Sequence, residues 1–284
     1  MLAATMPSPA HGVDHYENFP VASLLCPPRL RPAVKAIYHF ARTADDLADE
    51  GQASASQRLA ELDQFEADLA ACAGAEHPSS GRWPAVFEAL SPVLRDWDLP
   101  TELLRDLLSA FKQDVTQSSY ANEAQLLGYC RRSANPIGRL LLHLYQIRDA
   151  VSLQQSDDIC TALQLINFWQ DLSVDLPRGR LYLPDDLLAT HGLNRADLLQ
   201  PQPPGAAGAL IEDAVNWAER LMLRGAPLAR RVPGRAGWEL RLVVQGGLRI
   251  AQRVRRLGPL VLKQRPRLGR RDVALMAWRS LLMR

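Results

Sequence analysis

Hydrophobic residues recur along most of this chain at the three- and four-residue spacing of a helix. The clearest example is the stretch 57–73, in which Leu59, Leu62, Phe65 and Leu69 fall on one face. The same pattern predicts further helices over about 31–50, 82–96, 100–117, 123–149, 160–175, 209–231, 236–262 and from 270 onwards. Asn135-Pro136 should interrupt the longest of these. Because no stretch alternates as a half-buried strand does, the sequence predicts an all-α fold.

The stretch from Cys160 to Pro184 combines an apolar helix with a line of polar residues. It is apolar on most sides, which is typical of a buried helix. Steps of three, four and four place one polar stripe on it, consisting of Gln164, Asn167, Asp171 and Asp175. Unpaired carboxylates are very costly inside a protein. A divalent cation, which prefers oxygen ligands, would supply the missing partner.

A second acidic stripe lies between Arg31 and Gly51. Its members, at steps of four, three and four, are Tyr38, Arg42, Asp45 and Asp49, with Asp46 beside them. Two such stripes, far apart in the sequence, predict two helices that face each other across a cavity. Magnesium binds through a few carboxylates together with water and substrate phosphates. The cavity therefore suits a diphosphate, and an apolar interior behind it would protect a hydrocarbon tail from water.

Charge is distributed unevenly along the chain. The formal net charge is +2, yet the segment from Arg220 to Arg284 carries 16 Arg and one Lys against two acidic residues, Glu239 and Asp272. Such a segment attracts anionic partners, including anionic lipid and diphosphate. A solvated helix face explains it equally well.

Cysteine spacing and the N-terminus bear on the compartment. Four widely separated cysteines give neither a zinc motif nor a disulfide framework, which favours a reducing compartment. The N-terminus lacks the features of a signal peptide, and no apolar run reaches the ~18 residues of a membrane span. We expect a cytoplasmic protein with, at most, peripheral contact with the inner face of the cell membrane.

The motifs resemble those of the squalene/phytoene synthase family of isoprenoid synthases. They read Tyr38-xxx-Arg42-xx-Asp45-Asp46-xx-Asp49, Gln164-xx-Asn167-xxx-Asp171-xxx-Asp175 and Arg180-Leu181-Tyr182-Leu183-Pro184. The resemblance covers nearly the whole chain. It implies a single isoprenoid synthase domain over residues 1–284, a helical bundle around a central apolar cavity, in which we expect the first 14 residues to be mobile.

The resemblance also implies roles for individual residues. Two or three Mg²⁺ ions would be held by Asp45, Asp46, Asp49, Asn167, Asp171 and Asp175. Catalysis would involve Tyr38, Arg42 and Tyr182. Substrate contacts would come from Phe19, Arg42, Ala134, Gly138, Leu141, Gln164, Asn167, Arg180 and Tyr182. Core packing explains Phe19, Ala134, Gly138 and Leu141 equally well.

Within the family, three segments are most similar to the bacterial hydroxysqualene synthases of the hopanoid pathway: residues 17–23, 40–50 and 129–142. This implies conversion of presqualene diphosphate and water to hydroxysqualene and diphosphate, without NADPH and without nucleic acid. Other enzymes of the same pathway would be partners. Two alternatives stay open: head-to-head condensation of two farnesyl or geranylgeranyl diphosphates, and a helical membrane-surface protein without catalysis.

Overall fold

The computed structural model describes residues 26–74, 76, 78, 80–200, 202 and 204–283. Phe19 and the start of the chain, expected to be mobile, lie outside these residues. Among them the structure contains no strand, and an isolated parallel bridge between Ser119 and Leu181 is the one β contact. The all-α prediction is confirmed.

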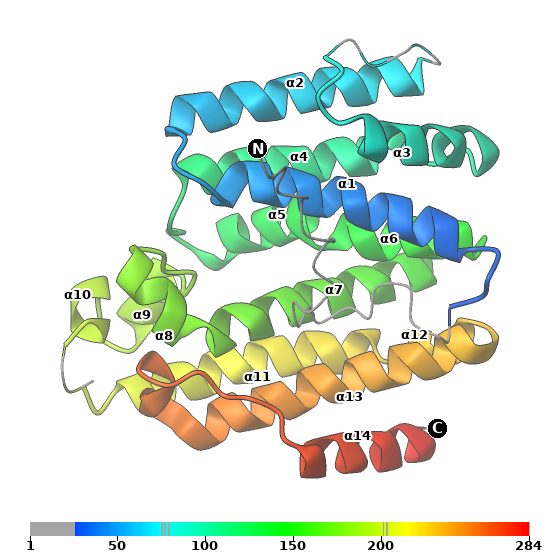
Figure 1. Ribbon diagram of the computed structural model, residues 1–284. Helices are drawn as coiled ribbons and strands as arrows, with labels where there is room; N and C mark the ends of the chain where they lie inside the picture. The colour runs from blue at the N-terminus through cyan, green and yellow to red at the C-terminus, as the bar shows by residue number, and fades with distance from the viewer. Residues whose placement is uncertain are drawn as a thin grey trace, which may run out of the picture.

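The helices form stacked layers (Figure 1). The first half contains α1 (Arg31–Asp49), α2 (Ala55–Ala73), α3 (Pro84–Asp96), α4 (Thr101–Thr116), α5 (Glu123–Ser133) and α6 (Asn135–Leu144). The second half contains α7 (Ala150–Gln170), α8 (Leu172–Asp175), α9 (Asp185–Thr190), α10 (Arg195–Leu198), α11 (Ala207–Gly225), α12 (Leu228–Arg231), α13 (Gly234–Leu257) and α14 (Arg270–Leu282). Short 3₁₀ turns follow α8 (Leu176–Arg178) and α13 (Gly258–Leu262).

Two clusters of buried side chains hold the layers together. The first holds helices α1, α2, α3 and α4 together. At its centre lie Phe40, Phe65 and Phe87, and the ring centroids of Phe40 and Phe65 are 5.0 Å apart. The second surrounds α7 and joins it to α11 and α13. There the indole Nε1 of Trp169 donates to the carbonyl of Ala214 at 3.0 Å. Helix α7 therefore anchors the second half of the chain.

Helix α7 also carries acidic residues that are satisfied by neighbouring helices. Asp157 accepts two hydrogen bonds from Arg139 of α6, at 2.9 and 2.6 Å. Asp158 accepts two from Arg224 of α11, both at 2.6 Å. Paired in this way, buried carboxylates are tolerated and fix the registry of the helices they join.

Several predicted boundaries were wrong. The stretch 123–149 divides at Ala134, as Asn135-Pro136 indicated, but α6 already ends at Leu144. Helix α7 begins at Ala150, ten positions before Cys160, because the side chain of Asp149 caps it by accepting from the Ser152 N–H. The predicted helices 209–231 and 236–262 are each interrupted next to a proline, Pro227 and Pro259.

The four cysteines are all buried free thiols. Cys26 and Cys72 lie in the first cluster and Cys130 in the second. Burial raises the pKa of Cys130 and of Cys160 to about 12. In the described part of the chain no helix combines the length and the apolar character needed to cross a bilayer.

The crossing of α7 and α11 is close enough to require glycine. A Cβ on Gly225 would lie 2.5 Å from the carbonyl oxygen of Gln155, a backbone atom that cannot rotate away. We expect Gly225→Ala to lower the free energy of unfolding by ~1–3 kcal/mol in chemical denaturation. Gly208→Ala is the matched control in the same helix, because its Cβ meets only Pro259 at 3.7 Å. That variant should be unchanged or slightly more stable. Equal stability of the two variants would contradict the close crossing.

Candidate active site

A cavity of about 760 Å³ lies between α1 and α7, walled also by α4, α5, α6 and α13. Most of the predicted polar residues line it: Asp45, Asp49, Gln164, Asn167, Asp171, Asp175, Arg180 and Tyr182. Its remaining wall includes Ala134, Ile137, Leu163, Phe168 and Ile250. The structure thus brings the two acidic stripes to one space, as their spacing predicted.

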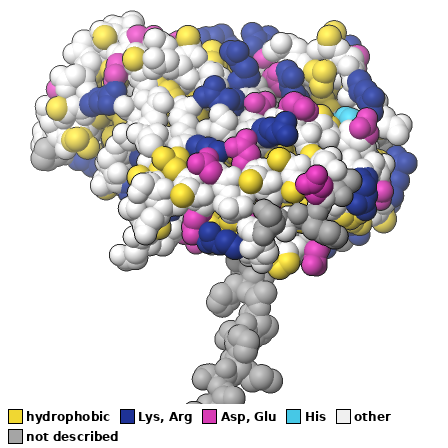
Figure 2. Space-filling model, turned by 90° about the horizontal axis from the view of Figure 1, so that it is seen from above, with side chains coloured by type: hydrophobic (Ala, Val, Ile, Leu, Met, Phe, Trp, Pro, Cys, Tyr) yellow, Lys and Arg dark blue, Asp and Glu magenta, His cyan; other side chains and the backbone are white. Residues whose placement is uncertain are grey.

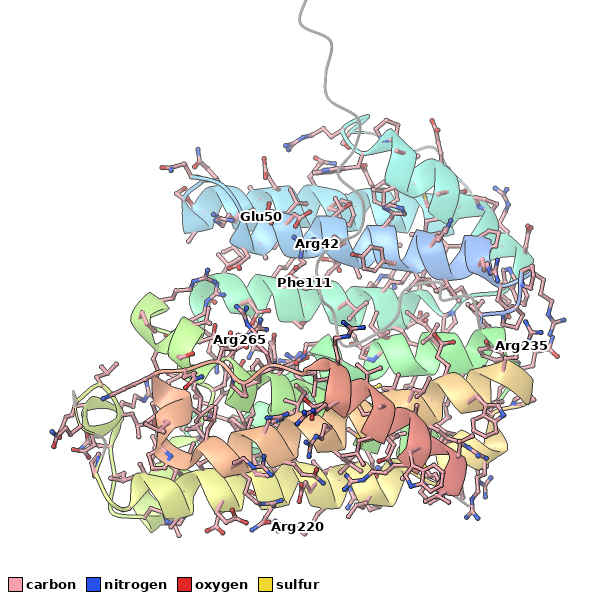
Figure 3. All side chains as sticks on the ribbon, turned by 60° about the horizontal axis from the view of Figure 1, so that its bottom comes forward. Arg42, Glu50, Phe111, Arg220, Arg235 and Arg265 are labelled. Carbon is pink, nitrogen blue, oxygen red and sulfur yellow. The ribbon has the colours of Figure 1, made fainter. Side chains whose placement is uncertain are left out.

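Arg42 pairs with three acidic side chains at the C-terminal end of α1. Its guanidinium contacts Asp45 at 2.9 Å, Asp46 at 2.6 Å and Glu50 at 2.9 Å. Figure 3 labels Arg42 on this helix and Glu50, the residue that follows its end. Three predicted site residues of α1 do not line the cavity within the described part of the chain: Tyr38, Arg42 and Asp46. Their assigned roles stay predictions.

The second stripe continues past the end of its helix. Helix α7 ends at Gln170, and Asp171 is its C-cap while Asp175 closes the short α8. The helical spacing is preserved because the N–H of Asp175 donates to the carbonyl of Asp171 at 2.9 Å. Burial, together with the charge of Asp171, raises the pKa of Asp175 to about 6. The ionised form of Asp175 is therefore disfavoured by its surroundings.

The loop after α8 carries Arg180 and Tyr182 into the cavity wall. It turns at Gly179, whose φ of +76° favours glycine, and the Leu181 N–H donates to the carbonyl of Ser118 at 2.9 Å. The ring of Tyr182 stacks on Phe168, with centroids 3.8 Å apart. Arg180 forms an ion pair with Asp49. The loop thus links the second motif to the first.

Residues 263–269, which we call the C-terminal strap, also reach this cavity. The side-chain amide of Gln170 donates to the carbonyl of Pro266 at 2.9 Å and holds the strap in place. Arg265 pairs with Asp171, while Arg267 and Leu268 line the cavity. Figure 3 labels Arg265 in the strap. Motif spacing did not reveal these residues, because they are distant in sequence from both stripes.

Asp114 of α4 is a further carboxylate in the wall. It belongs to neither of the two acidic stripes, so the motif spacing did not reveal it. Tyr129 Oη donates to its Oδ2 at 2.9 Å, while its Oδ1 is buried without a hydrogen-bond partner. Burial raises the pKa of Asp114 to about 7, although the hydrogen bond from Tyr129 and the charge of Arg180 act in the opposite direction. Its charged form is therefore disfavoured in the folded state.

This raised pKa predicts a pH-dependent gain in stability for Asp114→Asn. An acid whose pKa is higher in the folded state than its usual ~3.9 destabilises the fold progressively as pH rises. We expect the variant to exceed the parent in free energy of unfolding at about pH 8 by a few kcal/mol, with the difference shrinking towards about pH 4. Denaturant titrations across this range would measure it. The exposed Asp96→Asn is the control, and a constant difference across pH would contradict the prediction.

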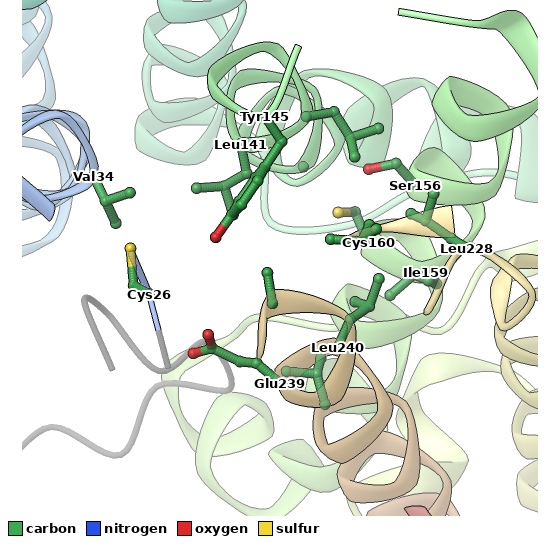
Figure 4. A pocket seen from close by; sticks show the side chains of 15 residues that line it. Cys26, Val34, Leu141, Tyr145, Ser156, Ile159, Cys160, Leu228, Glu239 and Leu240 are labelled. Atoms are coloured by element: carbon green, nitrogen blue, oxygen red, sulfur yellow. The ribbon is translucent and has the colours of Figure 1, made fainter. Parts of the chain in front are cut away.

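A smaller apolar pocket of about 120 Å³ adjoins the cavity (Figure 4). Cys160 lines both spaces, so they meet at this residue. Gly138 and Leu141, predicted to contact substrate, lie in the small pocket, whereas Ala134 lies in the large cavity. The site therefore has an acidic, arginine-rich part and an apolar extension.

The donors around the cavity fit magnesium. The polar side chains of both stripes offer oxygen, the ligand atom that Mg²⁺ prefers. In the described residues no three His, Cys, Asp or Glu side chains gather closely enough to hold an ion alone. Water and substrate phosphate would have to complete the coordination of an ion held here.

A helical bundle around an acidic cavity of this kind is typical of isoprenoid synthases. The chain belongs to the squalene/phytoene synthase family, whose sequence model matches residues 13–272. Enzymes of this family act on prenyl diphosphates and serve isoprenoid biosynthesis.

Individual relatives agree with this assignment. The chain is 36% identical to the hydroxysqualene synthase of Rhodopseudomonas palustris over 249 residues, 86% of this chain and 81% of that protein. It is 32% identical to the presqualene diphosphate synthase of the same organism over 225 residues, 78% of this chain and 77% of that protein. The crystal structure of squalene synthase HpnC from Alicyclobacillus acidocaldarius superposes with a TM-score of 0.78 at 35% identity, covering 86% and 90% of the two chains.

Proposed function

We propose that this enzyme converts presqualene diphosphate and water to hydroxysqualene and diphosphate, with magnesium as cofactor and without NADPH. The observation that carries the proposal is that an apolar pocket adjoins the acidic cavity. Carboxylates and arginines line the cavity, and the apolar pocket shares Cys160 with it as a wall residue. A substrate with one diphosphate and a long hydrocarbon matches this division.

In the proposed reaction the bond between carbon and the diphosphate oxygen breaks, the carbocation rearranges, and water forms the new carbon–oxygen bond and releases a proton. Bound magnesium would neutralise charge on the departing diphosphate, held by Asp45, Asp49, Asn167, Asp171 and Asp175. Arg180, Arg265 and Arg267 offer guanidinium groups suited to phosphate oxygens. The stacked rings of Phe168 and Tyr182 offer aromatic faces that attract positive charge.

A product assay tests this proposal. Purified enzyme with magnesium and no NADPH would receive presqualene diphosphate in one reaction and farnesyl diphosphate in another. We expect a triterpene alcohol from the first and little turnover in the second. Condensation of farnesyl diphosphate, with no alcohol formed from presqualene diphosphate, would overturn the proposal and support the head-to-head alternative. The similarity to a presqualene diphosphate synthase is the reason to test that alternative.

Substrate and product chemistry suggest the surroundings of the enzyme. A polyprenyl substrate and a triterpene alcohol dissolve in a bilayer, so we propose a cytoplasmic enzyme that contacts the inner face of the cell membrane. Enzymes that make presqualene diphosphate and consume hydroxysqualene would then act beside it.

A further inference from the structure

Helix α14 presents its apolar side to solvent. Among its residues the buried ones are both polar, Asp272 at 1% and Ser280 at 2% exposure. Four of its large apolar residues are between 55% and 60% exposed: Val273, Trp278, Leu281 and Leu282. Together with the exposed Ala274 and Ala277 they recur every four positions. We call these six residues the α14 stripe. Leu275 and Met276, on the other side of the helix, are half-buried.

Polar contacts with α13 hold α14 in this orientation. Asp272 accepts hydrogen bonds from Arg249 at 2.6 Å and from Arg253 at 2.7 and 2.9 Å. Burial alone would raise the pKa of Asp272, but the Gly269 N–H and these two arginines lower it to about 2. At the other end, Gln245 approaches the sulfur of Met283 at 3.8 Å. The inner side of α14 thus rests on α13 through Asp272 and through Met276, whose Cε would lie 3.3 Å from a Cβ on Gly246, and the stripe on the opposite side stays exposed.

The apolar surface continues from α14 onto α13. The contacts of Asp272 and Met283 show that α14 runs antiparallel to α13, so its end approaches the first half of α13. There Trp238 is 43% and Leu242 36% exposed, and the guanidinium of Arg241 lies 4.5 Å from the centre of the Trp238 ring. Figure 3 shows α14 in front of α13, with Arg235 near the start of the latter.

Within the segment 220–284, the exposed charges beside this surface are positive. Both acidic residues of the segment 220–284 face inward, since Asp272 is buried and Glu239 lines the small apolar pocket. Arg235, Arg270 and Arg271 are exposed. By contrast, the face above α2 and α3 mixes acidic and basic side chains (Figure 2). Exposed Trp and Leu flanked by Arg are typical of a helix that lies in a membrane interface.

We propose that the α14 stripe, with Trp238 and Leu242, docks the enzyme on an anionic phospholipid bilayer. Apolar side chains enter the interface while the surrounding arginines contact lipid phosphates. A second copy of the chain is a poorer occupant, because a symmetric contact would bring the same arginines against one another. The proposal names the surface for the membrane contact proposed above, and vesicle binding tests it independently of the reaction.

The test is flotation of the full-length protein with phosphatidylcholine vesicles, with and without phosphatidylglycerol. We expect binding only to the anionic vesicles, weakened by salt. Leu281→Gln/Leu282→Gln should reduce the partition coefficient at least about tenfold. Leu199→Gln is the matched control, since Leu199 is 63% and Leu281 59% exposed but Leu199 follows α10. Arg270→Gln/Arg271→Gln should weaken binding about fivefold per arginine, whereas Arg95→Gln/Arg105→Gln on α3 and α4 should not.

Other outcomes would overturn the proposal. Equal vesicle binding by Leu281→Gln/Leu282→Gln and Leu199→Gln would show that the stripe does not dock. A parent dimer that Leu281→Gln/Leu282→Gln converts to a monomer, without a change in vesicle binding, would assign the stripe to a contact between copies. Circular dichroism of each variant verifies that it is folded. We expect no loss of helix, because the substituted side chains are exposed.

Discussion

Asp171→Asn should lower turnover of presqualene diphosphate by at least about a hundredfold, the order of effect expected when one preorganised electrostatic contact is lost from a reacting centre. The substitution keeps the size of the side chain but removes the charge that it contributes to the second stripe. The stripe then offers magnesium one carboxylate fewer, and the magnesium concentration for half-maximal rate should also rise. Release of diphosphate measures both effects.

The control for this variant is Glu88→Gln, which removes a carboxylate from an exposed position on α3. Because Asp171 also pairs with Arg265, the loss of that ion pair must be separated from the loss of a metal ligand. Arg265→Gln breaks the same pair and leaves the carboxylate, so the magnesium concentration for its half-maximal rate should not rise. Unchanged turnover in Asp171→Asn would remove the metal argument altogether.

Gly138→Val should be the second most damaging substitution. A Cβ at this position would lie 2.3 Å from Ser156 Oγ and 2.6 Å from Cys160 Sγ, at the junction of the apolar pocket and the larger cavity. A valine there displaces those side chains and narrows the space for the hydrocarbon tail. We expect turnover to fall roughly a hundredfold, as for a substrate displaced by about 1 Å. Steady-state kinetics with presqualene diphosphate measure this loss.

Gly128→Val is the control, because it places a valine in the neighbouring helix α5 and away from the pocket. Gly128 lies in α5, and a Cβ there meets nothing within 4 Å. Its turnover should equal that of the parent. Binding of inorganic diphosphate, measured by calorimetry, should survive in Gly138→Val because the arginine-rich part of the site is untouched. Loss of diphosphate binding would indicate general unfolding and not a blocked pocket.

The position of the cavity could be predicted because helical periodicity fixes which residues share a face. Asp45 with Asp49, and Gln164 with Asn167, line one space for this reason. Periodicity gave no warning that α7 ends before Asp171, since no glycine or proline marks the boundary. The pairing of Arg42 with Asp45 and Asp46 also follows from spacing along one helix.

Contacts between distant segments could not be predicted in the same way. Arg180 and Asp49 are 131 positions apart, and Arg265 and Asp171 are 94 apart. The local pattern around each residue is compatible with many partners, and only the folded chain selects one. Helix α14 shows a further limit, because an apolar stripe ordinarily predicts the buried face. Here the ion pairs of Asp272 turn that stripe outward.

The buried cysteines allow local opening of the helices to be followed by thiol alkylation. A thiol reacts as the thiolate, so Cys72 in the first cluster and Cys130 in the second are protected from alkylation while their helices stay packed. Cys160 differs, because it borders both the cavity and the apolar pocket. Mass spectrometry of timed alkylation would therefore follow the two halves of the bundle separately. At Cys160 the same experiment would record when a hydrocarbon fills the site.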